Sequence, residues 1–306
     1  MANERGYSKD LLILPFDHRT SFQKKMLGHG NAPTPAEIEQ VAGYKMMIFE
    51  GFEKAVGTGL PKEKMGILVD EQFGSAVIKK AKAFGCSVSV AAEKSGQDEF
   101  DFEYGNDYAK HIESVNPDFV KVLVRYNPED DAATNQRQSR KLATLGQYLN
   151  EKNRKFIFEL LVPSTAAQLE RCKGEKPVFD VEMRPKLMVR AIHELQKANV
   201  EPDVWKLEGL DRKSDCEMVV EACREGGRSK VGVIILGRGE NDAKVREWLR
   251  VGANVSGVIG FAVGRTVFQQ ALLDFQAKKI GREEAVGRIA DSYAGFCRLW
   301  LEAREG

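Results

Sequence analysis

The chain has 306 residues, of which 42% are hydrophobic and 30% charged, and these proportions are those of a folded globular protein rather than a disordered one. Its 46 Lys and Arg residues nearly balance its 45 Asp and Glu residues, which leaves a formal net charge of +1. Such a balance gives no general attraction to polyanions, so neither nucleic acid nor a membrane surface is expected as a principal partner.

Eight apolar runs rich in β-branched residues follow one another along the chain, and each precedes a segment whose apolar residues have helical spacing. The runs cover residues 11–19, 65–74, 86–96, 119–128, 155–163, 204–209, 230–239 and 255–265. Clear examples of the helical spacing are residues 184–200 and 241–254. Because nearly continuous apolar strands that alternate with helices form a parallel sheet covered by helices, the eight units predict an α/β fold, the (β/α)8 TIM barrel.

The chain shows no internal boundary. No Pro-, Gly- or Ser-rich linker divides it, so we expect residues 1–306 to form a single domain. The last amphipathic stretch, residues 282–302, predicts an extra C-terminal helix. Residues 93–105 contain five carboxylates, but their spacing does not match a calcium-binding EF-hand loop. We interpret them as the loop after the third strand, folding over the end of the barrel.

Ionisable residues lie in or just after the C-terminal half of most of the apolar runs. They are Asp17, Arg19, Asp70, Glu71, Glu93, Lys94, Lys121, Arg125, Glu159, Lys206, Glu208, Arg238 and Arg265. In a TIM barrel the C-terminal ends of the strands form the active-site face, so these groups are predicted to converge on one mouth. The alternative is that single charges, such as Arg19, Asp70 or Lys94, only begin solvated loops.

Charged residues within the strands are more informative. With the period-2 alternation of a strand, Lys206 shares a face with Val204 and Glu208, and Lys121 and Glu159 fall on the corresponding faces of their own strands. Buried charges are retained when they are paired or functional, so the alternatives are an ion network that fills the barrel or a catalytic cluster. Burial and a neighbouring ammonium both lower a lysine pKa from about 10.4, and a neutral amine can attack a carbonyl. A nearby carboxylate can shuttle the protons that this reaction requires.

Several motifs of the chain match a known family. FDHR, the lysine of VKVLVRYNP, the glutamate of FELLVP and the lysine of VWKLEG resemble class I (Schiff-base) sugar-phosphate aldolases, which include the tagatose-bisphosphate aldolases. Between residues 11 and 268, the motifs LPFDHRTSF, VDEQFG, EKSGQDEFDFEYG, VRYNPEDD, FELLVP, EPDVWKLEG, LGRG and GFAVGRTVF resemble the aldolase-like domain (DUF2090) fused behind a sugar kinase in inositol-catabolic proteins.

This resemblance implies that 2-deoxy-5-keto-gluconate 6-phosphate is cleaved to dihydroxyacetone phosphate and malonate semialdehyde. The chain lacks the kinase half of the fused proteins. The remaining alternatives are therefore a tagatose-bisphosphate or sulfo-sugar phosphate aldolase, a noncatalytic sugar-phosphate-binding barrel, and a subunit that binds a separate kinase.

The resemblance also implies roles for four residues. Lys206 would form an imine with the substrate ketone, and Asp17 would take the proton from the hydroxyl on the carbon released as an aldehyde. Lys121 would polarise that hydroxyl or the new aldehyde, and Glu159 would act as the acid and base of imine formation. No metal or cofactor is expected, because the iminium replaces the Lewis acid of a metal-dependent route. Of the four histidines only His18 lies near a strand end, and we expect it to be a hydrogen-bond donor rather than a metal ligand.

A phosphorylated sugar needs an anion site, and the sequence offers one. The loops after the seventh and eighth strands of such barrels often bind phosphate, with glycines that expose backbone N–H groups and arginines that add charge. The residues expected there are Gly237, Arg238, Gly239, Gly264 and Arg265. Arg19 and Arg125 are candidates for a substrate carboxylate, with surface placement as the alternative.

The compartment and the assembly are the last expectations. The five cysteines are scattered and contain no C-x-x-C motif, which argues against a disulfide framework or a thiolate zinc site. The polar start MANERGYSKD has no apolar signal segment, so we expect a reducing, cytoplasmic compartment. Barrels of this type often form homo-oligomers, and the sequence leaves the oligomeric state open.

Overall fold

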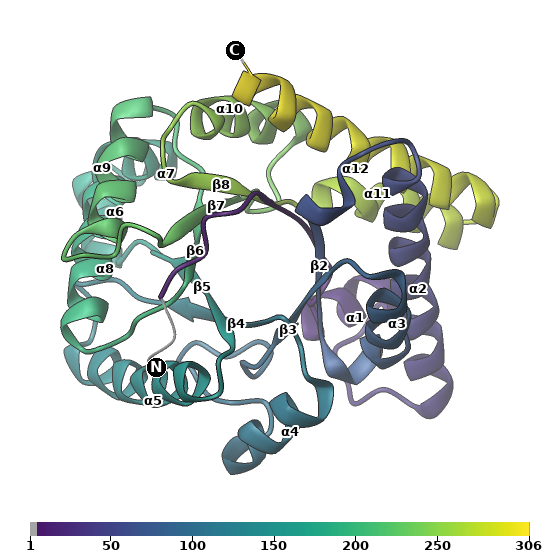
Figure 1. Cartoon of the computed structure of the whole chain (residues 1–306), viewed down its shortest axis with the longest axis horizontal. Helices are drawn as coiled ribbons and strands as arrows, with labels where there is room; N and C mark the ends of the chain where they lie inside the picture. The colour runs from purple at the N-terminus through teal and green to yellow at the C-terminus, as the bar shows by residue number, and fades with distance from the viewer. Residues whose placement is uncertain (1–4, 306) are drawn as a thin grey trace.

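Eight parallel strands close into a ring in the computed structural model, which describes residues 5–305. The strands are β1 (Leu11–Pro15), β2 (Met65–Val69), β3 (Ser87–Ala91), β4 (Phe119–Arg125), β5 (Lys155–Leu161), β6 (Val204–Glu208), β7 (Gly232–Leu236) and β8 (Val258–Ala262). Each strand pairs with its neighbours in sequence, and β1 pairs with β8 to close the ring (Figure 1). Every strand lies within one of the eight predicted runs, so the predicted (β/α)8 barrel is confirmed.

Helices surround the ring. They are α1 (Thr20–Leu27), α2 (Pro35–Val56), α3 (Glu71–Phe84), α4 (Tyr108–Val115), α5 (Ala132–Glu151), α6 (Ala166–Arg171), α7 (Lys176–Val178), α8 (Arg184–Lys197), α9 (Lys213–Arg224), α10 (Asp242–Ala253), α11 (Arg265–Gln276) and α12 (Arg282–Glu305). Short turns of helix are η1 (Lys62–Lys64), η2 (Gly105–Asp107) and the π-helical η3 (Phe179–Met183). No helix in the described part of the chain is both long and apolar enough to cross a membrane.

The barrel has two apolar cores because successive side chains of a strand point to opposite faces. One core lies inside the ring and the larger one fills the layer between strands and helices. The inner core contains Leu11, Ile13, Leu68, Phe119, Ile157, Val204, Ile234, Ile259 and Ala262. The three strand charges of interest each follow an inner-core residue by two positions, so they extend the inner face toward the C-terminal mouth.

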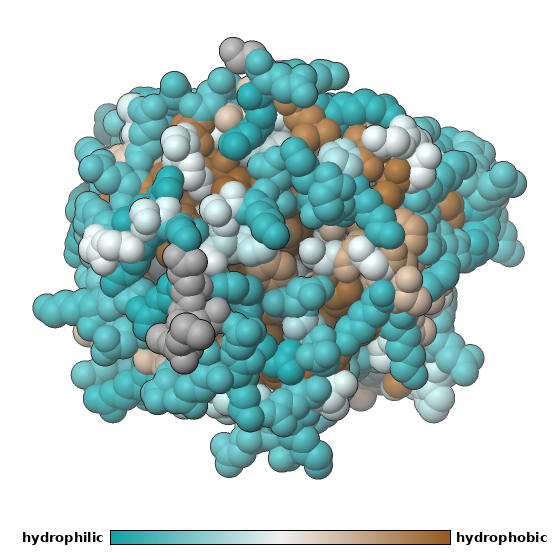
Figure 2. All heavy atoms as spheres, in the orientation of Figure 1, coloured by the Kyte–Doolittle hydropathy of each residue, from teal (hydrophilic) through white to brown (hydrophobic). Residues whose placement is uncertain are grey.

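The chain before β1 crosses the opposite, N-terminal end of the barrel (Figure 1). The Gly6 N–H donates to Asp203 Oδ1 at 2.8 Å, and the ring of Tyr7 packs edge-on against Phe119 with centroids 5.0 Å apart. Figure 2 shows this face, with hydrophilic residues over most of the rim and hydrophobic ones toward the middle. This end is therefore packed, and the open mouth lies at the other end.

The C-terminal helix α12 is part of the outer layer. It packs against α2, α10 and α11, and its Tyr293 hydroxyl donates to the carbonyl of Leu12 at 2.7 Å. Phe296 and Trp300 contact the ring of Phe261 on β8. The helix extends three residues beyond the predicted end and covers the place where β8 meets β1.

Candidate active site

A cavity of about 530 Å³ opens at the C-terminal mouth of the barrel. The charged groups that the sequence predicted there and that line it are Asp17, Arg19, Glu93, Lys94, Lys121, Arg125, Glu159, Lys206, Glu208, Arg238 and Arg265. Two of the strand-end carboxylates do not reach the cavity. Asp70 is fully buried against Lys45 and accepts the first-turn N–H of Phe73 at 2.9 Å, and Glu71 contacts His111 at 3.0 Å.

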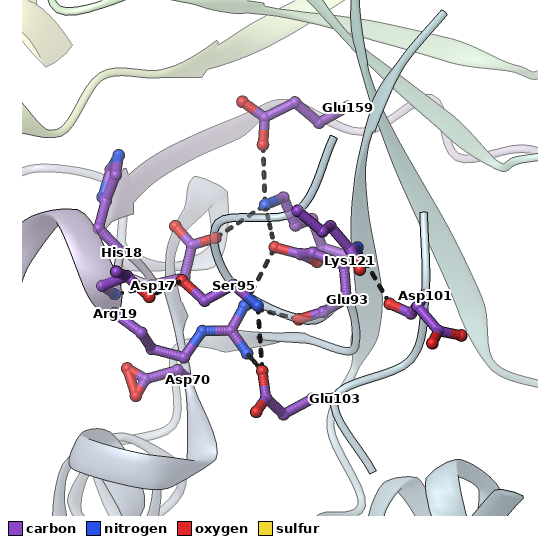
Figure 3. A network of polar contacts seen from close by, with 12 residues as sticks. Asp17, His18, Arg19, Asp70, Glu93, Ser95, Asp101, Glu103, Lys121 and Glu159 are labelled. Atoms are coloured by element: carbon purple, nitrogen blue, oxygen red, sulfur yellow. Dashed lines mark hydrogen bonds and ion pairs between the residues drawn. The ribbon is translucent and has the colours of Figure 1, made fainter. Parts of the chain in front are cut away.

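The Lys121 ammonium lies at the centre of three carboxylates (Figure 3). Its Nζ is 2.8 Å from Asp17 Oδ2, 2.9 Å from Glu93 Oε1 and 2.9 Å from Glu159 Oε2. An ammonium has three N–H donors, so all of them are used. Lys121 is 1% exposed, so these three contacts, rather than water, offset the free-energy cost of burying its charge.

Glu159 joins the two lysines. Its Oε2 also lies 2.8 Å from Lys206 Nζ, and the two residues are direct partners in the register of β5 and β6. Lys206 is 4% exposed and points into the barrel, as the alternation predicted. The contacts therefore form one chain, from Lys206 through Glu159 to Lys121 and on to Asp17 and Glu93.

Opposite charges decide the protonation of most of this cluster. Burial alone would raise the pKa of Asp17 and of Glu159, but the ammonium groups of Lys121 and Lys206 outweigh it and hold both pKa values below the ordinary range. Burial would lower the pKa of Lys121, but its three carboxylates outweigh burial and raise that pKa well above its usual value. Asp17 and Glu159 are therefore carboxylates and Lys121 is an ammonium at neutral pH.

Glu93 is the one member of this cluster for which the sequence analysis predicted no catalytic role. Arg19 holds it in place, because Nη2 donates to the Glu93 carbonyl at 2.7 Å and Nη1 contacts Glu103 at 2.8 Å. Glu93 also pairs with Phe102 in an antiparallel bridge that folds the loop back over β3. Burial raises the pKa of Glu93 despite the nearby charges of Lys121 and Arg19. The sequence does contain a signal that Glu93 points into the barrel. Glu93 lies two residues beyond Ala91, so the period-2 alternation of β3 places both side chains on the inner face.

The two arginines considered for a substrate carboxylate have different surroundings. Arg19 is 5% exposed and its guanidinium is engaged by Glu93 and Glu103, so it stabilises the loop after β3. Arg125 is exposed at the cavity rim and donates to the carbonyl of Gln97 at 2.7 Å. It retains donors that can face a ligand.

Two carboxylates hold Arg238 on the cavity wall. Its Nε contacts Glu208 Oε1 at 3.0 Å, and its Nη1 contacts Asp180 Oδ2 at 2.9 Å. Its backbone has φ of 51°, an unusual conformation for a residue other than glycine. The sequence could not show this pairing, because Asp180 comes from the π-helical turn η3, far from β7 in sequence.

Arg265 is the better placed of the two arginines for phosphate. It begins α11, its Nη2 donates to the Arg238 carbonyl at 2.9 Å, and within residues 5–305 it forms no ion pair with a carboxylate. Gly264 is required by packing, because a Cβ there would lie 2.1 Å from the Pro15 carbonyl oxygen. Gly239 has φ of 78°, and a Cβ on it would lie 2.6 Å from the Arg265 guanidinium. Gly237 has no such close contact.

His18 lies on the cavity wall beside these groups. Burial, together with the charges of Arg265 and Lys206, lowers its pKa to about 4 against the opposing carboxylates of Asp17 and Glu159. The imidazole is therefore neutral at physiological pH. Its Nδ1 is buried and has no hydrogen-bond partner in the part of the chain that the structure describes.

Comparisons with known proteins agree with the architecture. A family model described as "Uncharacterized protein conserved in bacteria (DUF2090)" matches residues 1–304. A fructose-bisphosphate aldolase from Plasmodium falciparum, solved with TRAP and a small-molecule inhibitor, superposes with a TM-score of 0.66 at 13% identity, covering 100% of this chain and 93% of its own. A protein from Corynebacterium glutamicum, solved as a structural genomics target, gives a TM-score of 0.58 at 16% identity, covering 98% and 90%. No curated protein matches the chain in sequence. At these identities the structural matches establish the fold alone.

Proposed function

The chain belongs to the DUF2090 family of proteins conserved in bacteria, and we propose that it is a Schiff-base aldolase that cleaves a phosphorylated keto sugar acid. One observation carries this proposal. A buried lysine, Lys206, projects into the mouth of the barrel and shares the carboxylate of Glu159 with a second buried lysine, Lys121. The alternative is an ion network that only fills the barrel. Such a network would have no need of an amine on the wall of a cavity large enough for a substrate.

The contacts support the following roles. Glu159 accepts the proton of the Lys206 ammonium, and the free amine attacks the ketone carbon. Glu159 then returns a proton to the hydroxyl that leaves as water, which gives the iminium. Breaking the bond between the carbons α and β to the iminium moves its electron pair into the iminium and forms an enamine, while the hydroxyl on the β carbon loses its proton and becomes the aldehyde. Protonation of the enamine at the α carbon and hydrolysis of the imine then release dihydroxyacetone phosphate and the Lys206 amine. Lys121, held as an ammonium, stabilises the oxygen of that aldehyde as it forms.

The charge of the cavity wall supports a substrate with several negative charges. Eight lysine and arginine side chains and five carboxylates line it, an excess of three positive charges in a chain whose formal net charge is +1. One phosphate and one carboxylate would balance this excess. The substrate proposed is 2-deoxy-5-keto-gluconate 6-phosphate, with dihydroxyacetone phosphate and malonate semialdehyde as products.

Borohydride reduction in the presence of dihydroxyacetone phosphate tests the chemistry. Reduction of the imine adds the mass of the ligand to the peptide that contains Lys206, and mass spectrometry locates it. An assay of dihydroxyacetone phosphate release should compare the proposed substrate with tagatose bisphosphate and a sulfo-sugar phosphate. An adduct on another lysine, or no adduct, would contradict the proposed mechanism. Trapping at Lys206 with release from only tagatose bisphosphate would assign the substrate to the alternative.

Replacing Arg265 by alanine should weaken phosphate binding without removing the catalytic amine. A charge-assisted hydrogen bond contributes roughly 1.5–3 kcal/mol, so KM for the phosphorylated substrate should rise about 10- to 100-fold with a smaller change in kcat. Steady-state kinetics would measure both constants. Arg250→Ala, an exposed arginine on the outer helix α10, is the matched control and should leave both constants unchanged. An unchanged KM in Arg265→Ala would place the phosphate elsewhere.

A further inference from the structure

One oxygen of the Lys121 cluster has no partner. Glu93 accepts from Lys121 with Oε1, while its Oε2 is buried and forms no hydrogen bond with any of residues 5–305. Glu93 is 5% exposed and lies on the cavity wall. A buried carboxylate oxygen without a partner is rare in folded proteins, and beside a substrate cavity it is suited to a hydroxyl that the substrate brings.

The place of Glu93 in the contact chain fits the hydroxyl that must be deprotonated. Glu159 contacts both Lys206 and Lys121, whereas Glu93 contacts only Lys121 of these two lysines. In the proposed cleavage, the hydroxyl that becomes the aldehyde is two carbons from the imine carbon. Its base must therefore lie beyond the amine and its carboxylate, on the side where Lys121 meets Asp17 and Glu93.

Asp17 and Glu93 differ as bases. The pKa of Asp17 lies below its ordinary range because Lys121 and Lys206 outweigh the effect of burial. The pKa of Glu93 is raised by burial, even though Lys121 and Arg19 oppose that shift. A carboxylate is a better general base when its pKa is closer to the working pH, so the environment favours Glu93 over Asp17.

We propose that Glu93 is the catalytic base of carbon–carbon cleavage, an inference that rests on the aldolase function proposed above. Oε2 takes the hydroxyl proton, the oxygen–hydrogen electron pair becomes the second bond of the aldehyde, and the electrons of the broken carbon–carbon bond enter the iminium. Glu93 ends the step as a neutral carboxylic acid, a form that suits a buried site. Asp17 holds the Lys121 ammonium and is a positioning residue.

The groups around Glu93 hold its side chain in place on the cavity wall. Lys121 on β4 fixes Oε1, and Arg19, which follows β1, fixes the Glu93 carbonyl and contacts Oε1 at 3.4 Å. Glu103 engages the other end of the Arg19 guanidinium at 2.8 Å. These contacts come from three different segments, so the side chain is preorganised rather than mobile.

Glu93→Gln tests the proposal, because the amide can still accept the hydrogen bond of Lys121 but cannot take a proton. Cleavage should fall in kcat by about 10²- to 10⁴-fold. Borohydride trapping of dihydroxyacetone phosphate on Lys206 should be retained. Exchange of a carbon-bound hydrogen of dihydroxyacetone phosphate for deuterium should also be retained, because neither reaction involves the hydroxyl that becomes the aldehyde. Glu93→Asp keeps a carboxylate and should recover part of the cleavage rate. Glu99→Gln, a partly exposed residue of the same loop paired with Arg137, should match the wild type.

The readouts separate the two proposals. If wild-type protein does not trap dihydroxyacetone phosphate, the aldolase proposal and the role of Glu93 both fail. If it does, the role of Glu93 is refuted by Glu93→Gln cleavage within about threefold of wild type. The role is also refuted if Glu93→Gln loses trapping and exchange together with cleavage. That result would mean that Glu93 only holds Lys121 in position. A larger cleavage defect in Asp17→Asn than in Glu93→Gln, with exchange intact in both, would make Asp17 the base.

Discussion

Lys206→Met should lose both borohydride trapping and cleavage, with a fall in kcat of at least about 10⁴-fold, because the variant lacks the amine that forms the imine in the proposed mechanism. The fold should survive. Methionine has a similar length, and Glu159 keeps the Lys121 ammonium as a partner at 2.9 Å when Lys206 is removed. Intact-mass spectrometry after reduction and an assay of released dihydroxyacetone phosphate measure the two losses.

The matched control is Lys213→Met, an exposed lysine at the start of α9 whose contact with Glu217 is 3.6 Å. It should trap ligand on Lys206 and cleave substrate at the wild-type rate. Cleavage that persists in Lys206→Met would contradict the Schiff-base mechanism. If EDTA then abolished the remaining activity, a metal-dependent route would replace it.

The strands and the inner charges were predictable because they depend on local rules. A strand buried on both faces reads as a continuous apolar run, and its side chains alternate with a fixed period. Counting by two from Phe119, Ile157 and Val204 leads to Lys121, Glu159 and Lys206, which the structure brings together. The predicted runs extended past the strands because they included the loops that carry further site residues.

Contacts that depend on distant segments could not be predicted in this way. Asp70 has the position of a catalytic carboxylate at a strand end, yet Lys45 from α2 pairs with it in a fully buried site. Arg238 has the motif of a phosphate ligand, yet Asp180 from the π-helical η3 engages it. In both cases a partner from a separate segment pairs with the charged side chain, and a single sequence shows no signal for such pairing.

Lys121→Met should be the most destabilising of the substitutions, and its effect should depend on pH. In the wild type, Asp17 and Glu159 have lowered pKa values, so their charged forms stabilise the fold above an ordinary pKa of about 4, and this contribution is lost as the pH falls through the folded values. Without the ammonium, three buried carboxylates face one another and their pKa values rise. The variant should therefore lose about 3–5 kcal/mol at about pH 8 and clearly less at about pH 5.

Urea unfolding followed by circular dichroism at the two pH values measures this difference. Lys141→Met is the control, because Lys141 forms an exposed ion pair with Asp101 at 2.8 Å, and its loss should cost no more than about 1 kcal/mol at either pH. An equal loss at both pH values in Lys121→Met would mean that the lysine stabilises the barrel through packing rather than charge. A loss that grows with pH would mean that Lys121 is the counter-charge that keeps Asp17, Glu93 and Glu159 together in the folded protein, and that this arrangement is the precondition for any proton transfer at the site.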